Sequence, residues 1–275
     1  MSSSKPLDGV ARTALGVARM RAAEHVRPDR LFADPYAQAF VEAVPESPPQ
    51  PPPSPGSLPA LMAFQAVIRT RFYDDYLLGS CAGGERRQVV LLAAGLDTRA
   101  YRLRWPDGVR VFEVDLPEVL AFKDRVLASV AATPACARSA CPADLREDWP
   151  RGLFESGFTT SRPTVWLLEG LLIYLTANEA AALLTTIGAL SAPGSRVSSE
   201  RGDGVDRLRE RARELPALAR AAELWKGGLG DDTTGWLERH DWHTEQHDLG
   251  ALAESYGRPV PAGTRSGFVT ATYRA

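Results

Sequence analysis

Short apolar segments alternate with longer helical patterns through the part of the sequence that follows Gly83 and Gly84. An apolar run of strand length followed by a helical period is typical of a βα unit, and a series of such units folds into a mainly parallel sheet with helices on both faces. We therefore predict an α/β fold with a doubly wound, mainly parallel sheet. The expected strands are residues 88–93, 109–115, 137–143, 163–169, 196–200 and 266–273, and the expected helices between them are 97–102, 117–131 and 178–190.

The residues before the sheet show helical spacing on both sides of a proline-rich segment. Asp34 and Pro35 predict a helix start, because Asp is a good N-cap and Pro suits the first helical turn. Residues 45–59 are rich in proline, which lacks an N–H donor, so we expect an exposed, partly polyproline loop. A variable loop is favoured there over a ligand for a signalling domain. The expected helices are residues 13–26, 36–44 and 60–78.

A second irregular region follows the fifth expected strand. Residues 202–240 are charged and helical in pattern at first, and then broken by Gly227, Gly228 and Gly230. Glycine at such density interrupts a helix. We therefore predict a lid-like insertion rather than a part of the sheet.

Composition excludes several classes of protein. With 44% hydrophobic and 24% charged residues and a formal net charge of -2, the chain is neither disordered nor suited to a polyanion such as nucleic acid. No apolar run reaches the roughly 18 residues that a membrane span needs. The three cysteines are an odd number in a long chain, which fits a reducing compartment. We expect a cytoplasmic protein; the sequence does not reveal its oligomeric state.

The first two expected strands end in residues that suit a nucleoside. Ligands bind such sheets beyond the carboxyl ends of the strands. The first strand runs into Ala94 and Gly95, small residues that let a backbone turn approach a ligand closely. The second strand ends at Asp115, 20 residues beyond Gly95, where a carboxylate can accept hydrogen bonds from both ribose hydroxyls. The alternative is that Asp115 only caps the helix that follows Leu116.

The next two expected strands also end in carboxylates. Asp144 and Leu145 follow the third strand, a place beside the base in nucleoside-binding sheets, where Asp can accept from an exocyclic amine and Leu can pack on the ring. Glu169 ends the strongly apolar fourth strand and precedes Gly170. Because burial of an unpaired charge is costly, Glu169 should be hydrogen-bonded or paired with a cation.

The histidines mark a separate candidate site. His240, His243 and His247 would share one face if their segment were helical. A metal site is disfavoured, because no tight histidine pair is flanked by a cysteine ligand, and we predict no metal. The cluster could instead supply a base that takes a proton from a substrate hydroxyl, or it could be a solvated helix face. His25, beside Glu24, is by default a surface residue, although it could also approach a substrate.

Four linked runs, VVLLAAGLDTRAYRL, VFEVDLPEVLAFK, ADLREDWP and LLEGLLIYLT, resemble the leucine carboxyl methyltransferase family, including its bacterial natural-product branch. Three N-terminal segments, RAAE from Arg21, DPYA from Asp34 and RTR from Arg69, resemble the same family. The resemblance extends from about Thr13 to Ser199. It implies a class I, Rossmann-like methyltransferase core at residues 85–275 and an N-terminal helical lid at residues 1–84.

The resemblance implies a role for each matching residue in holding S-adenosylmethionine (SAM), whose product is S-adenosylhomocysteine. Gly95 would line the methionine portion, Asp115 would hold the ribose, and Glu169 would face the ammonium or sulfonium. Arg71 would bind the methionine carboxylate, with Arg69 near enough to compete for that role. The expected cofactor-binding residues are Arg71, Ala94, Gly95, Asp115, Leu116, Asp144, Leu145, Glu169 and Gly170, and the expected catalytic residues are Glu169, Tyr174 and Arg21.

The function that follows is O-methylation of a carboxylate on a small molecule or a peptide. Two other functions remain open. One is methylation of a phenol or another hydroxyl of a secondary metabolite, which needs a nearby base. The other is a non-catalytic nucleoside-binding module. A dinucleotide oxidoreductase is disfavoured, because the sequence lacks the G-x-G-x-x-G fingerprint.

Overall fold

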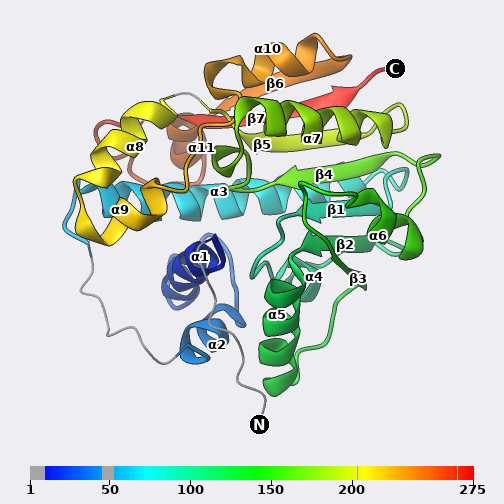
Figure 1. The fold of residues 1–275 in the computed structure, drawn as a ribbon. Helices are drawn as coiled ribbons and strands as arrows, with labels where there is room; N and C mark the ends of the chain where they lie inside the picture. The colour runs from blue at the N-terminus through cyan, green and yellow to red at the C-terminus, as the bar shows by residue number, and fades with distance from the viewer. Residues whose placement is uncertain (1–9, 45–52, 203, 265) are drawn as a thin grey trace.

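The computed structural model describes residues 10–44, 53–202, 204–264 and 266–275, and it confirms the doubly wound α/β fold (Figure 1). Seven strands form one sheet in the order β3-β2-β1-β4-β5-β7-β6. The first five strands are parallel to one another, whereas β7 is antiparallel to both β5 and β6. The strands are β1 Gln88–Leu92, β2 Arg110–Asp115, β3 Ala137–Pro142, β4 Thr164–Leu168, β5 Arg196–Glu200, β6 Trp242–Asp248 and β7 Gly267–Tyr273.

The two faces of the sheet are both buried, and the central strands are apolar after their first residue. All five residues of β1 and all five of β4 are buried. Since successive side chains of a strand point to opposite faces, Val90 and Leu92 pack with helices α6, α7 and α10, while Val89 and Leu91 pack with α3 and α11. The helices on the sheet are α3 Leu58–Cys81, α4 Arg99–Arg102, α5 Pro117–Ser129, α6 Pro150–Glu155, α7 Ala177–Ala189, α10 Thr233–Glu238 and α11 Leu249–Ser255.

Local capping explains where helices α3 and α7 begin. Helix α3 starts after Ser57, whose hydroxyl accepts a hydrogen bond from Ala60 N at 3.4 Å. Helix α7 starts with a reciprocal capping box between Thr176 and Glu179. The predicted helix starts at residues 60 and 178 therefore lie within two residues of the observed ones.

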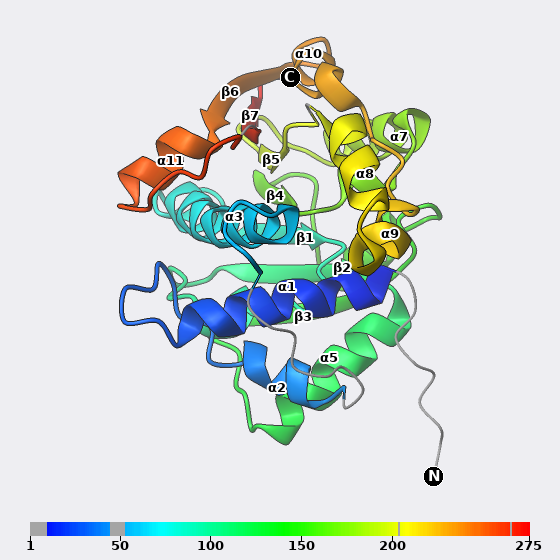
Figure 2. The same cartoon turned by 90° about the vertical axis from the view of Figure 1, so that its left-hand side faces the viewer.

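The remaining helices lie beyond the carboxyl ends of the parallel strands (Figure 2). Helices α1 and α2 pack with α5 through a small apolar cluster that contains Leu15, Phe40 and Phe122. Helices α8 and α9 occupy the predicted insertion, between β5 and β6. These elements are α1 Val10–His25, α2 Ala37–Glu42, η1 Leu172–Tyr174, α8 Val205–Arg213, α9 Pro216–Ala222 and η2 Gly230–Asp232.

The proline-rich loop falls largely at residues 45–52, outside the described residues. The division into a lid at 1–84 and a core at 85–275 stays a prediction, although α3 packs on the sheet through Ile68 and Leu77. Among the described residues, no helix is both long enough and apolar enough to cross a membrane.

A buried ion pair joins the sheet to α5 near its edge. Lys123 Nζ lies 2.8 Å from Glu113 Oε2, and both side chains are fully buried. Arg138 of β3 lies 2.7 Å from the same oxygen. The second cation explains how a fully buried carboxylate is tolerated in the middle of an apolar strand.

We expect Glu113→Gln to lower the free energy of unfolding by about 3–5 kcal/mol, because it leaves a buried ammonium without any described carboxylate at ion-pair distance. Urea denaturation measures the change. Glu118→Gln, at an exposed position of α5, is the matched control and should change stability by less than about 0.5 kcal/mol. Equal losses in the two variants would contradict the role of the pair.

Candidate functional site

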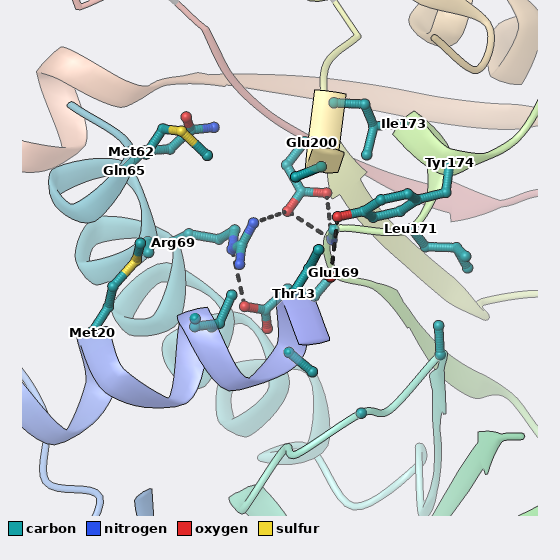
Figure 3. Close-up of a pocket in the computed structure, with 18 of the residues that line it drawn as sticks. Thr13, Met20, Met62, Gln65, Arg69, Glu169, Leu171, Ile173, Tyr174 and Glu200 are labelled. Carbon is teal, nitrogen blue, oxygen red and sulfur yellow. Dashed lines mark hydrogen bonds and ion pairs between the residues drawn. The ribbon is translucent and has the colours of Figure 1, made fainter. Parts of the chain in front are cut away.

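The carboxyl ends of β1 to β5 open into one large cavity of about 2770 Å³. Pockets for a single ligand commonly measure about 300–1,000 Å³. The cavity therefore has room for two ligands side by side. Residues that close the strands form its floor, and α1, α3, η1, α8 and α9 surround the rest. Figure 3 shows Thr13 and Met20 of α1, Arg69 of α3 and Tyr174 of η1 around the strand-end acids Glu169 and Glu200.

The turn after β1 brings Gly95 and Asp115 together, as the spacing predicts. Gly95 has φ +48°, a left-handed conformation that favours glycine, and its N–H donates to Asp115 Oδ2 at 2.6 Å. Leu116 N donates to Asp115 Oδ1 at 2.7 Å. Burial raises the pKa of Asp115, and these two hydrogen bonds oppose that effect. Each carboxylate oxygen can still accept another hydrogen bond, since it has two lone pairs.

Asp144 and Leu145 also line the cavity after β3. Leu145 packs against the apolar core on one face of the sheet. Asp144 is paired with Arg146, whose Nε lies 2.9 Å from Asp144 Oδ1, and this hydrogen bond lowers the pKa of Asp144. The sequence reasoning missed Arg146, which competes with any ligand amine for this carboxylate.

An alternating row of acids and arginines crosses the cavity floor. Arg69 of α3 donates from Nε to Glu169 Oε1 at 2.9 Å, and its Nη1 lies 3.2 Å from Glu200 Oε1 (Figure 3). Both carboxylate oxygens of Glu200 lie 3.0 Å from Gly170 N. Glu200 was not predicted as a site residue, although an acid at the end of the fifth expected strand was a usable signal. The prediction that Glu169 is paired with a cation is confirmed.

Arg99 extends this row of charges toward the turn after β1. Its side chain is 2% exposed and contacts three carboxylates: Asp74 at 2.7 Å, Glu169 at 2.6 Å and Asp97. Burial alone would raise the pKa of Asp97, but Arg99 and other nearby cations lower it to about 2. Burial also opposes ionisation of Glu169, and Arg99 and Arg69 together lower its pKa. Glu200, with Arg69 as its salt-bridge partner, has a pKa raised by burial.

Arg71 does not line the cavity, so its predicted role needs correction. It donates to Leu31 O and to Asp75 Oδ2, each at 2.9 Å, and its side chain is 40% exposed. Residues two apart on an α-helix point about 200° apart. Because Arg69 faces the cavity, Arg71 faces away from it.

Arg21 and Tyr174 both line the cavity, but they do different things there. Arg21 pairs with buried Asp34 at 2.9 Å and donates from Nη2 to Leu96 O at 2.6 Å. Its guanidinium therefore fixes α1 to the turn after β1, and its catalytic role stays a prediction. The Tyr174 hydroxyl lies 3.3 Å from Thr13 Oγ1 and connects η1 to α1.

The histidine cluster is not helical, because His243 and His247 lie on strand β6. His247 Nε2 is 2.9 Å from Thr270 Oγ1, and the ring packs on Phe72. His240 stacks on Trp236. All four histidines, His25 included, lie in the described part of the chain, and none of them lines the cavity. The described residues include no group of three or more potential metal ligands.

Most of the chain matches a known protein family. The family model described as leucine carboxyl methyltransferase matches residues 14–188. A relative from Parafrankia sp., named as an S-adenosyl-L-methionine-dependent methyltransferase, is 48% identical over 92% of this chain and 83% of its own length. A second, from Frankia alni and similarly named, is 48% identical over 97% of this chain and 95% of its own.

Solved structures support the fold. A Thermobifida fusca protein named as a methyltransferase matches with a TM-score of 0.54 at 20% identity, covering 94% of each chain. A magnesium protoporphyrin IX methyltransferase from Synechocystis, crystallised with bound SAM, matches with a TM-score of 0.50 at 11% identity over 94% of this chain and 96% of its own.

The lowered pKa of Asp97 makes part of the stability depend on pH. Its folded pKa of about 2 lies below the usual value of 3.8, so the ionised group stabilises the fold above about pH 4, and this contribution is lost as pH falls toward 2. We expect the stability difference between the wild type and Asp97→Asn to shrink by roughly 2 kcal/mol between pH 5 and pH 2. Urea midpoints across this range measure it, and a constant difference would contradict the assignment.

Proposed function

The chain belongs to the leucine carboxyl methyltransferase family and is a SAM-dependent methyltransferase, and from this premise we propose that it methylates a carboxylate to form a methyl ester. The observation that carries the proposal is that none of the four histidines lines the cavity. A hydroxyl acceptor needs a free base near it, and the acids of the cavity already contact arginines or accept backbone N–H groups. A carboxylate acceptor with a pKa near 4 needs no base, because it is already ionised at neutral pH. We also place the reaction in the cytoplasm, in keeping with three free cysteines.

The strand ends fit the chemistry of the methyl donor. In the proposed arrangement Asp115 accepts from the ribose hydroxyls, since each of its oxygens has one lone pair left after the bonds from Gly95 and Leu116. Leu145 packs on the adenine, with Asp144 beside it. The methionine part lies at the row of Glu169, Arg69 and Glu200.

Arg69, rather than Arg71, is our candidate for the methionine carboxylate. The methionine part of SAM ends in a zwitterion, which can bind between Arg69 and Glu169 without a change in net charge. Its carboxylate would pair with Arg69 and its ammonium with Glu169. The exchange leaves no buried charge unpaired, which is the main cost of breaking such a pair. Glu200 then keeps Arg69 oriented from the other side, at 3.2 Å.

The residues contribute alignment and exclusion of water, which are the main requirements of methyl transfer. SAM supplies a methyl group activated on a sulfonium, so that an acceptor oxygen forms the new C–O bond as the C–S bond breaks and its electron pair moves to sulfur. Arg21 and Tyr174 hold α1 and η1 over the cavity through the bonds to Leu96 and Thr13. Tyr174, whose hydroxyl faces the cavity, is our candidate for contact with the acceptor.

Arg69→Lys should weaken binding of S-adenosylhomocysteine by about 10-fold or more, because lysine keeps the charge but loses the forked geometry that binds a carboxylate. Arg71→Lys is the matched control and should leave the dissociation constant unchanged, since Arg71 faces away from the cavity. Isothermal titration calorimetry measures both. A larger loss from the Arg71 variant would reverse the assignment.

The acceptor class can be tested by the mass gain of one methyl group across matched carboxylic acids and phenols. We expect methyl esters, with a kcat that is flat from about pH 6 to 9 because no protein base has to lose a proton. Methyl ethers, with a kcat that rises through a protein pKa, would replace the carboxylate by a hydroxyl acceptor. Saturable SAM binding without transfer to any acceptor would indicate a non-catalytic module.

A further inference from the structure

The cavity continues beyond the strand ends into an apolar chamber. Met20 of α1 and Met62 of α3 face it on one side, and Ile173 of η1 faces it on the other (Figure 3). The insertion contributes Leu208 of α8, Leu218 of α9 and Trp225, which follows α9. Apolar walls of this kind stabilise a bulky apolar body by burying it from water.

Glycines allow both ends of the insertion to pack closely against neighbouring backbone beside this chamber. A Cβ on Gly202 would lie 2.4 Å from Gly230 O, and a Cβ on Gly228 would lie 2.7 Å from Leu172 O. Side chains at these positions would clash with backbone, so the two ends of the insertion meet each other and η1 closely. Lys226 N also donates to Ile173 O at 2.8 Å. Helices α8 and α9 are thereby fixed beside the apolar chamber.

Four arginines line the cavity on this side. Arg207 and Arg211 are four residues apart on α8, and therefore share one face of the helix. Arg220 comes from α9 and Arg19 from α1. None of the four has an ion pair or a side-chain hydrogen bond to any residue in the described part of the chain.

The other charged residues of the cavity are paired. Lys226 pairs with Glu179, Arg146 with Asp144, and Arg258 with Glu24. The acids at the strand ends either contact arginines or accept backbone N–H groups. The uncompensated charge is therefore positive, and it lies on the side of the cavity formed by α1, α8 and α9.

We propose that the insertion binds a second anionic group of the acceptor, such as a carboxylate, sulfate or phosphate, through Arg207, Arg211 and Arg220, while the apolar body of the acceptor fills the chamber. This inference rests on the proposed function for the group that is methylated. Like charges four residues apart on a helix repel one another, so an oxyanion bound by Arg207 and Arg211 removes that repulsion while accepting forked hydrogen bonds from arginine. The acceptor is thus an amphipathic anion with at least two acidic groups.

Two dyes with the same aromatic body test the anion preference directly. 1-Anilinonaphthalene-8-sulfonate carries a sulfonate, whereas N-phenyl-1-naphthylamine is neutral. With the full chain and saturating S-adenosylhomocysteine, fluorescence titration should show that the sulfonate dye binds about 10-fold tighter or more, and that added salt reduces this preference.

The variant Arg207→Ala/Arg211→Ala should lose most of the preference, with binding of the sulfonate dye about 10-fold weaker and binding of the neutral dye unchanged. Arg213→Ala is the matched control, because this arginine lies on the same helix but does not line the cavity. Equal affinity for both dyes in the wild type, an equal loss of both in the double variant, or the same loss in the control would each overturn the inference.

The result of the dye titration does not depend on whether the proposed methylation occurs. Dye binding requires no methyl transfer, so a failure to form methyl esters would leave the dye result intact. Ester formation together with equal dye affinities would reject only the second anionic group. Cofactor affinity of the double variant, measured by calorimetry, should remain that of the wild type, which separates loss of the anion site from misfolding.

Discussion

One buried guanidinium organises the site. Arg99 contacts carboxylates from three parts of the chain, Asp74 of α3, Asp97 of the turn after β1 and Glu169 at the end of β4. A charge that is 2% exposed must be compensated by its surroundings, because desolvation costs several kcal/mol for each ion. The position of α3 is therefore tied to the turn and to β4, and Arg69, on the same helix, is placed over Glu169.

A chain of alternating acids and arginines extends from Arg99 in two directions. Arg102 shares Asp74 with it, and Asp34 lies between Arg102 and Arg21 of α1. In the other direction Glu169 leads through Arg69 to Glu200 of β5. The helix that covers the cavity and the strand ends that form its floor are thus members of one ion-pair network. Such a network favours one relative arrangement of its elements, because any displacement would leave a buried charge unpaired.

The two ends of the cavity differ in charge. Where the family implies a zwitterion and a ribose, the acids and arginines are matched to one another. On the side of the cavity lined by α1, α8 and α9, four arginines have no ion-pair partner among the described residues. This division provides a physical basis for selecting an acceptor by charge, because the same cavity presents a balanced surface to one ligand and a positive one to the other.

The sequence alone determined the doubly wound sheet and the pairing of Gly95 with Asp115, because these depend on local information: apolar runs of strand length, small residues at a turn, and a fixed spacing. It did not determine that Arg69 rather than Arg71 faces the cavity, since both lie on one helix and only the packing of α3 on the sheet sets its rotation. Strand β6 was missed for a similar reason. Its polar residues carry no apolar alternation, and the strand exists because β7 provides a partner along its whole length. The grouping of Glu200 with Arg69 and Glu169 also required the tertiary structure, because only the packing of α3 on the sheet brings Arg69 within ion-pair distance of both carboxylates.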